Sequence, residues 1–320
     1  MGRGQRLLRG ALVGVGVIAA GAGVAWLGVE RAVARAMDQT WTAHGGDFAI
    51  PPPPLDVDPT LPPDPSAAQA AAVARGAHLV EARYGCIECH GADFGGGTMI
   101  DDPLIGSLRG PNLTLGRGGV TAGYTAADWD RKVRHGVRPD GRSGWMPSDD
   151  YVRMSDRELG DIVTYLRSLP PVDREVPPVH FGPLGKVLVA TGQLPIAAAR
   201  IPTVDHHPAE PPATADTVDF GDHLLAVCTG CHRANLEGGP IPGGAPDWRP
   251  AANLSPHADG LAAWTRDDFV RAMRTGVRPD GSAFGVPMAM MVPYGARSTD
   301  TELHAMWTAL QARPAVPDGR

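Results

Sequence analysis

Two short motifs contain all four cysteines of this chain. Each has the form C-x-x-C-H: residues 86–90 read C-I-E-C-H, and residues 228–232 read C-T-G-C-H. Two cysteines on one helical turn can each bond a vinyl group of the same porphyrin, and the histidine that follows can supply an axial nitrogen to its iron. Such a string is typical of covalent haem attachment, so two haem groups are expected. The residues concerned are Cys86, Cys89 and His90, and Cys228, Cys231 and His232.

Paired cysteines also occur in zinc sites and in dithiol oxidoreductases. A shared four-cysteine zinc site would have to join pairs that begin at residues 86 and 228, whereas zinc ribbons space their pairs by about 15–20 residues. A dithiol oxidoreductase would be expected on alternating strand and helix patterns, and the sequence has no convincing run of strands. Haem is therefore the better assignment for the thiols, and no cysteine remains for a structural disulfide.

The composition is that of a loop-rich globular protein without a basic surface. The chain has 320 residues, 41 glycines, 32 prolines, 20% charged residues and a net charge of −6. Nucleic-acid-binding proteins usually concentrate positive charge, so no nucleic-acid partner is expected. The length is enough for two domains, each with its own core.

The first 36 residues differ from the rest of the chain. Three arginines precede the uncharged run Ala11–Val29, which as a helix would measure about 28 Å, close to the thickness of a bilayer core. Two interpretations compete: a retained signal anchor, and a signal peptide cleaved at the A-R-A string of residues 34–36. We favour the anchor because the run is longer than a usual signal peptide and charged residues separate it from that string. Either way the later residues are exported, so we expect a single-pass protein of the bacterial inner membrane, or a periplasmic one.

The segments around the two motifs repeat one another with a spacing of about 140 residues. A period this long indicates two homologous domains, not a solenoid. The matching strings are residues 76–79 and 221–224, 112–114 and 253–255, 134–141 and 274–281, and 155–159 and 299–303. The predicted parts are an anchor (1–36), a stiff proline-rich spacer (37–66), a first repeat (67–172), an interdomain segment (173–212) that packs across both repeats, and a second repeat (213–315).

Helix signals occur at matching places in both repeats. Thr125 and Thr265 are candidate N-caps, and Gly136 and Gly276 are expected to end those helices in a left-handed conformation. The last helix of each repeat opens with a capping box, S-x-x-E at 155–158 and T-x-x-E at 299–302. Apolar residues then recur on one helical face. Both repeats are therefore expected to be all-α, with long loops.

On these motifs, both repeats resemble class I c-type cytochrome domains. The chain is also similar to the cytochrome subunits of membrane-bound bacterial dehydrogenases, which usually carry a third domain. The resemblance covers about residues 68–172 and 213–314. It implies two tandem all-α cytochrome c-like domains, each wrapped around a covalently bound haem c. With the N-terminal run, the expected architecture is these two domains preceded by one transmembrane helix.

The resemblance also implies that a methionine shortly before the final helix supplies the sixth iron ligand, and a His/Met pair raises the reduction potential. In the first repeat the candidate is Met146, in the string G-W-M-P nine residues before Ser155. The alternatives are that Met146 fills a gap in the core and that Met154 is the ligand.

The ligand of the second repeat is less clearly indicated. Counting nine residues back from Thr299 gives Met290, with Met291 as the alternative and Met288 close by. Only one of the three can bind the iron, and the others are then packing residues. Two histidines are further alternatives, as replacement ligands or as ordinary surface residues: His223 and His304.

Several other shared residues have less specific roles. Arg134 and Arg274 either pair with haem propionates or lie on a solvated helix face. Asn112 and Asn253 either hold a loop over the haem edge or make simple turns. His135 aligns with a threonine of the second repeat, so we interpret it as a surface residue.

A small residue on the first helix of such domains is crossed by an aromatic residue of the last helix, as the resemblance implies. Gly76 and Tyr165 fit this role in the first repeat. In the second repeat Ala309 matches Tyr165, and Trp307 is the candidate substitute.

The expected function is one-electron transfer outside the cytoplasm, without catalytic residues. The sequence contains no Rossmann fingerprint, P-loop or G-x-S-x-G string, and an iron with both axial positions filled binds no substrate. Expected partners are a quinol-oxidising complex, a terminal oxidase or a dehydrogenase, together with the membrane. Two alternatives remain: the cytochrome subunit of a dehydrogenase, and a di-haem peroxidase-like enzyme with an open site at the second haem.

Overall fold

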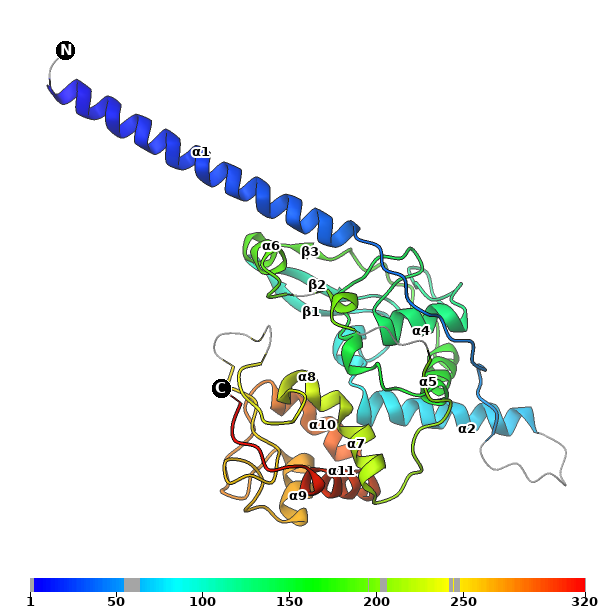
Figure 1. The fold of residues 1–320 in the computed structure, drawn as a ribbon. Helices are drawn as coiled ribbons and strands as arrows, with labels where there is room; N and C mark the ends of the chain where they lie inside the picture. Colours follow the sequence, from blue (N-terminus) through cyan, green and yellow to red (C-terminus); the bar gives the residue numbers. More distant parts are fainter. Residues whose placement is uncertain are drawn as a thin grey trace.

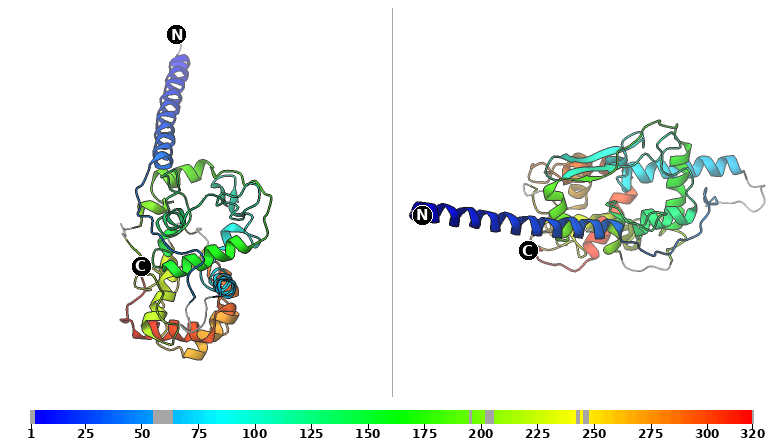
Figure 2. Two further views of the ribbon diagram at one scale, coloured as in Figure 1. Left: turned by 90° about the vertical axis from the view of Figure 1, so that its right-hand side faces the viewer. Right: turned by 90° about the horizontal axis from the view of Figure 1, so that it is seen from above.

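The computed structural model describes the backbone of residues 3–54, 64–194, 196–201, 206–241, 244 and 248–319, and the side chains from residue 20 onward in these ranges. The helices are α1 (Arg3–Asp38), α2 (Pro65–His78), α3 (Ile87–His90), α4 (Ala126–His135), α5 (Asp156–Ser168), α6 (Pro183–Ala190), α7 (Val218–Leu225), α8 (Thr229–His232), α9 (Arg266–Thr275), α10 (Val292–Arg297) and α11 (Asp300–Ala312). Short helical turns are η1 (Leu79–Arg83), η2 (Ser148–Asp150), η3 (Ala197–Ala199), η4 (Ala226–Cys228) and η5 (Met288–Met291), and the strands are β1 (Gly97–Asp102), β2 (Gly106–Gly110) and β3 (His180–Phe181). Helices of the first repeat gather in one group and those of the second repeat in another beside it (Figures 1 and 2).

In the first repeat α2 crosses α5 at Gly76. A Cβ atom at this position would lie 2.7 Å from the Cβ of Tyr165 and far inside van der Waals contact of the Asp161 carbonyl oxygen. Only glycine therefore permits this close approach of the two backbones. The predicted crossing of Gly76 and Tyr165 is confirmed, and the Arg75–Asp161 ion pair lies next to it.

The second repeat has the same crossing between α7 and α11. A Cβ atom at Gly221 would lie 2.6 Å from the Cβ of Ala309. Ala309 therefore occupies the place that Tyr165 has in the first repeat. Trp307 packs instead against Phe269, with ring centroids 5.8 Å apart. The suggestion that Trp307 substitutes at the crossing is therefore wrong.

The predicted helix ends are present in both repeats. The helices α4, α5, α9 and α11 each begin with a full capping box, and α4 and α9 end at Gly136 and Gly276 with φ of 69° and 72°. These signals act within a few residues, which is why the sequence alone specifies them.

The two asparagines after the motifs tie a loop to the end of their repeat. The Nδ2 atom of Asn112 donates to the carbonyl of Val172 at 2.7 Å, and that of Asn253 donates to the carbonyl of Val316 at 2.7 Å. Their Oδ1 atoms accept from the backbone two residues later. The two repeats are therefore similar in individual hydrogen bonds as well as in sequence.

The chain also contains a small sheet that the all-α prediction omitted. Strands β1, β2 and β3 form an antiparallel sheet in that order, and β3 belongs to the interdomain segment. The short glycine-rich strands lack the long alternating pattern from which strands are recognised. The first repeat is therefore mostly helical, with a sheet beside its C-x-x-C-H motif.

The described parts of the interdomain segment pack on the first repeat, and the expected packing across both repeats stays a prediction. Phe181 is buried against Trp145 with ring centroids 4.6 Å apart, and α6 packs against the C-terminal end of α1 through Val33 and Val189. Backbone carbonyls of Pro208 and Ala209 accept hydrogen bonds at the start of α5. In the described ranges, no hydrogen bond of this segment reaches the second repeat.

The proline-rich spacer is likewise packed where the structure describes it. Phe48 and Ile50 contact the core of the first repeat, and the carbonyl of Pro53 accepts a hydrogen bond from Arg157 at 2.7 Å. This part of the predicted stiff spacer is therefore held against the first repeat, and residues 55–63 lie outside the described residues.

Helix α1 extends away from the body of the molecule toward the N-terminus (Figures 1 and 2). Among the described parts of the chain, none of the helices combines the length and apolar character needed to cross a bilayer. In the predicted anchor run, Ala11–Val29, the side chains of residues 11–19 lie outside the described part.

Candidate functional site

The first C-x-x-C-H motif forms one helical turn at the sheet. Cys86 precedes α3, and neither cysteine of the motif is in a disulfide. Burial raises the pKa of Cys86 to about 12 and that of Cys89 to about 11, so both are neutral thiols at neutral pH. The Sδ atom of Met99, on β1, lies 3.0 Å from the Sγ atom of Cys89. No sequence signal pointed to this methionine.

The histidine of the motif is held in one orientation. His90 is buried, and its Nδ1 atom donates a 3.0 Å hydrogen bond to the carbonyl of Pro111. Burial lowers the pKa of His90, which favours the neutral imidazole. With Nδ1 protonated, the lone pair is on Nε2, and a backbone carbonyl on the other ring nitrogen is the usual support of a metal-binding histidine.

The second motif has the same geometry. Cys228 precedes α8, and the Nδ1 atom of His232 donates to the carbonyl of Ala252 at 2.7 Å. Burial raises the pKa of Cys228 to about 12 and lowers that of His232. Both motifs therefore present two reduced thiols and a histidine with Nε2 available, which are the groups that covalent haem attachment uses.

These thiols are poorly arranged for the zinc alternative. Within the described residues, neither motif gathers three possible metal-ligand atoms within 4.8 Å of one another. A tetrahedral zinc site needs four such atoms around one point. The geometry thus agrees with the preference for haem over zinc.

The methionine candidates lie in different surroundings. Met154 is 2% exposed and packs in the core of the first repeat, as a core residue would. Met146 is half-buried in the loop before η2. Met290 and Met291 lie in η5 with 44% and 36% of their surface exposed. It stays a prediction that Met146 and Met290 are the iron ligands, with Met291 and Met288 as alternatives to Met290.

The two motifs face one interface between the repeats. On one side, the hydroxyl of Tyr294, from α10, donates to Glu88 inside the first motif at 2.9 Å. On the other side, η2 of the first repeat lies against the second motif, where a Cβ atom at Gly230 would be 2.5 Å from Asp150 Oδ1. Each motif is thus contacted by the segment that precedes the last helix of the other repeat.

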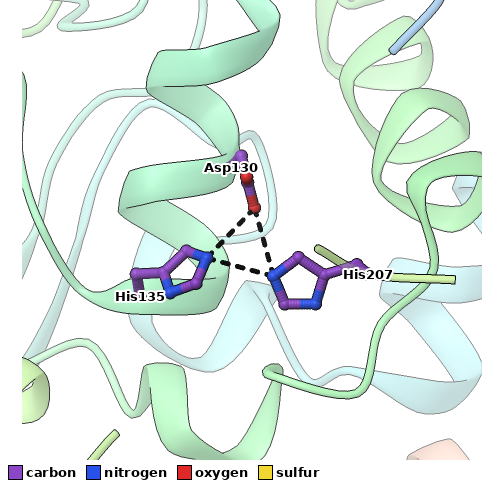
Figure 3. A group of neighbouring side chains, drawn as sticks. All are labelled: Asp130, His135 and His207. Atoms are coloured by element: carbon purple, nitrogen blue, oxygen red, sulfur yellow. Dashed lines mark hydrogen bonds and ion pairs between the residues drawn. The ribbon is translucent and has the colours of Figure 1, made fainter. Parts of the chain in front are cut away.

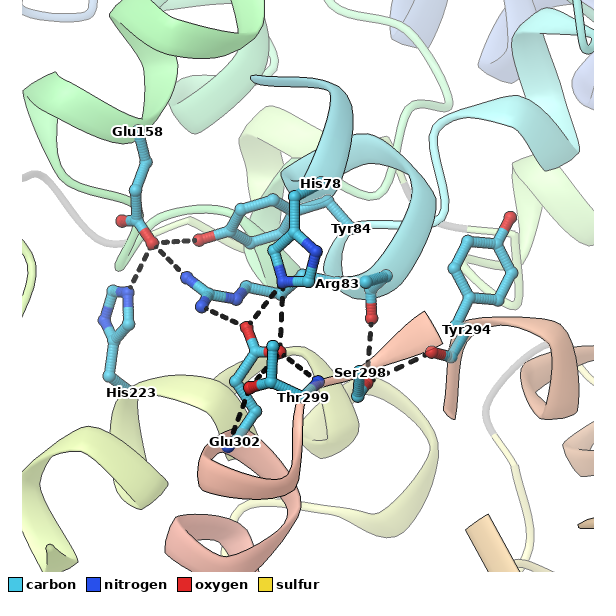
Figure 4. Close-up of polar contacts among 10 residues, drawn as sticks. His78, Arg83, Tyr84, Glu158, His223, Tyr294, Ser298, Thr299 and Glu302 are labelled. Carbon is cyan, nitrogen blue, oxygen red and sulfur yellow. Dashed lines mark hydrogen bonds and ion pairs between the residues drawn. The ribbon is translucent and has the colours of Figure 1, made fainter. Parts of the chain in front are cut away.

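Reciprocal pairs of histidine and glutamate hold this interface (Figure 4). His78 of the first repeat contacts Glu302 of the second at 2.9 Å, and His223 of the second repeat contacts Glu158 of the first at 2.8 Å. Arg83 lies between the glutamates and donates to both, at 2.6 and 2.8 Å. These histidines and glutamates occupy matching positions of the two repeats, so the interface is close to symmetric.

Each glutamate also caps its own helix. One oxygen of Glu158 accepts from the backbone of Ser155, and one oxygen of Glu302 accepts from the backbone of Thr299. Burial raises the pKa of both carboxyl groups. For Glu158 the hydrogen bond and charge of His223 and the charge of Arg83 outweigh burial and lower the pKa to about 2. The pKa of Glu302 is also lowered to about 2. Here the hydrogen bond of His78, the backbone of Thr299 and the charge of Arg83 outweigh burial.

Three residues are placed differently from their sequence interpretations. His223 is hydrogen bonded to Glu158, which gives it a structural partner in place of an iron. Arg134 is fully buried and pairs with Asp130 and Asp156, so it neither pairs with a propionate nor lies on a solvated face. His135 is 5% exposed, so its interpretation as a surface residue is wrong. A helical sequence pattern alone does not reveal which later segment covers these side chains.

Residues 73–170 match the model of the cytochrome c family. The chain is 30% identical over 283 residues to the cytochrome c subunit of a quinone-dependent alcohol dehydrogenase from Gluconacetobacter polyoxogenes, which covers 78% of this chain and 58% of that protein. It is 27% identical to a fructose dehydrogenase cytochrome subunit from Gluconobacter japonicus, over 79% of this chain and 55% of that subunit. A diheme cytochrome c-type protein of Cereibacter sphaeroides is 25% identical, over 72% of this chain and 83% of its own length. The chain thus spans little more than half the length of the dehydrogenase subunits.

Proposed function

Because residues 73–170 form a domain of the cytochrome c family, we propose that this chain carries single electrons through two covalently bound haem c groups, one in each repeat. Each haem, when bound, supplies an iron that gains and loses one electron. The observation that supports two haems is the matching geometry of the motifs, down to the hydrogen bond from each histidine to a backbone carbonyl.

The proposed attachment residues are Cys86 and Cys89 in the first repeat and Cys228 and Cys231 in the second. A pyridine haemochrome assay of the full chain should give two haems per polypeptide. Replacing either pair of cysteines by serine should leave one. A wild-type count of one, or no loss in the Cys228→Ser, Cys231→Ser variant, would contradict the proposal.

The interface between the repeats suggests that electrons pass from one haem to the other inside the chain. Both motifs contact this interface, and the reciprocal pairs of His78 with Glu302 and His223 with Glu158 hold the repeats together. A fixed separation suits electron transfer because the residues that position each haem need not move when its charge changes.

The sixth ligands of the two irons are proposed to be Met146 and Met290. The reduced wild-type protein should then be indifferent to carbon monoxide. Met146→Ala and Met290→Ala should each make one haem reactive. Reactivity in Met291→Ala in place of Met290→Ala would shift the register by one residue, whereas a reactive wild type would favour the peroxidase-like alternative.

The proposed partner is a dehydrogenase that reduces this chain. Two of the proteins to which it is similar are named as cytochrome subunits of an alcohol and a fructose dehydrogenase. If the proposal holds, the protein should co-purify with a dehydrogenase from mild detergent extracts of its source, and an oxidisable alcohol or sugar should reduce its haems in that complex. Purification of the chain alone under these conditions would argue for a freely diffusing carrier.

Membrane attachment through the N-terminal run is also part of the proposal. It is supported by the length and apolar character of Ala11–Val29. After cell fractionation the chain should remain in the membrane pellet through a high-salt wash, facing the periplasm. A variant lacking residues 1–30 but given a cleavable export signal should be soluble and still carry its haems.

A further inference from the structure

A second group of side chains that could bind a metal ion contains no residue of either C-x-x-C-H motif (Figure 3). Asp130 and His135 belong to α4, and His207 belongs to the interdomain segment. The Nε2 atoms of the two histidines are 3.0 Å apart, and Asp130 Oδ1 lies 3.6 Å from His135 Nε2 and 3.5 Å from His207 Nε2. All three potential ligand atoms therefore point to one spot.

The spacing of these atoms is that of a tetrahedral metal site. Zinc binds imidazole nitrogen and carboxylate oxygen at about 2.0–2.1 Å, so neighbouring ligands of a tetrahedral ion lie about 3.3 Å apart. The three observed separations lie within about 0.3 Å of this value. The side chains need only small movements to surround an ion.

Burial and support also favour a built site. Asp130 is fully buried, and the two histidines are at most 9% exposed. Arg134 Nε donates to Asp130 Oδ1 at 2.7 Å, and the backbone of Gly46 donates to Oδ2 at 2.5 Å. These hydrogen bonds fix the carboxylate, as the outer partners of metal ligands usually do.

The second repeat lacks this group although it keeps the neighbouring arginine. Val270 and Thr275 stand at the positions of Asp130 and His135, whereas Arg274 matches Arg134 and makes the same type of ion pair, with Asp300. The cytochrome-like fold of a repeat therefore does not require the three side chains. They belong to the first repeat and to the segment that follows it.

We propose that Asp130, His135 and His207 bind one zinc ion. Two imidazoles and one carboxylate are ligands that zinc prefers, and they leave a fourth position for water. The ion joins α4 to the end of the interdomain segment, next to the N-terminal stretch that contains Gly46. In this place the ion fastens the segment between the repeats to the first repeat.

The test uses the untagged full-length protein with its haems. After dialysis against metal-free buffer and then ZnCl₂ with removal of excess, elemental analysis should find one zinc per chain. His135→Gln and His207→Gln should reduce the bound zinc at least tenfold. The control variant His206→Gln changes the exposed neighbouring histidine and should retain the bound zinc.

A thermal measurement avoids dependence on variants that fold poorly. Zinc should raise the melting temperature of the wild type, and EDTA should reverse the rise. The His207→Gln protein should show neither effect while its haem absorption remains that of the wild type. The proposal would be overturned if the wild type bound no zinc and its melting temperature did not respond to zinc. The contact of His135 with His207 would then be only a buried hydrogen bond. Since haem content is read separately, this result is distinguishable from a failure of the electron-transfer proposal.

Discussion

Removing the charge of Glu302 is the sharpest test of the interface between the repeats. In the Glu302→Gln variant the amide keeps nearly the same shape. However, it cannot accept charge-assisted hydrogen bonds from both His78 and Arg83, which the carboxylate holds at 2.8–3.0 Å. The variant should therefore weaken the contact of the repeats and the cap of α11 together.

The magnitude follows from the pKa of the carboxyl group. Folding lowers this pKa from 4.5 to about 2, which corresponds to on the order of 3 kcal/mol of stability at neutral pH. Because the folded-state pKa is the lower one, this stabilisation is complete above about pH 5. It declines as the pH falls through 4.5 toward 2, and about 1 kcal/mol remains at pH 3. The Gln variant lacks this pH dependence.

Urea unfolding followed by circular dichroism at pH 7 and pH 3 measures the difference. At pH 7, Glu302→Gln should be less stable than wild type by about 2–3 kcal/mol, and at pH 3 the gap should shrink to about 1 kcal/mol. The control is Asp268→Asn, which alters the capping box of α9 at a partly exposed position whose hydrogen bonds, among the described residues, go to Thr265 and Arg271 of its own repeat. It should cost about 1 kcal/mol or less. An equal gap at both pH values, or a Glu302→Gln effect no larger than that of the control, would refute the reasoning.

Three further substitutions test packing and contacts, each by thermal unfolding of the haem-loaded protein. Gly221→Ala should cost several kcal/mol because its Cβ overlaps α11, whereas Gly123→Ala, which meets no atom within 4 Å, should cost less than about 1 kcal/mol. Asn112→Ala should cost about 1–3 kcal/mol by leaving buried loop groups unpaired. Tyr294→Phe should cost about 1 kcal/mol by removing the hydrogen bond to Glu88; an unchanged melting temperature would show that this bond contributes nothing.

The sequence by itself determined the features that depend on near neighbours. The C-x-x-C-H strings, the capping boxes that start at Thr125, Ser155, Thr265 and Thr299, and the glycines that end α4 and α9 each act over a few residues. Their hydrogen bonds form wherever the local backbone turns, so the pattern is enough to predict them. The glycine at the crossing of α2 and α5 was predictable too, since the family resemblance supplied the contact.

Only the tertiary structure decided which distant segments meet. His78 and Glu302 are far apart in the chain, as are His135 and His207, and nothing in the local sequence of either residue specifies the partner. The same holds for Arg134, which lies on an apparently polar helix but is covered by other segments of the chain. Such contacts arise from the summed packing of two repeats and the segment between them, so they can be located only when all of these are placed together.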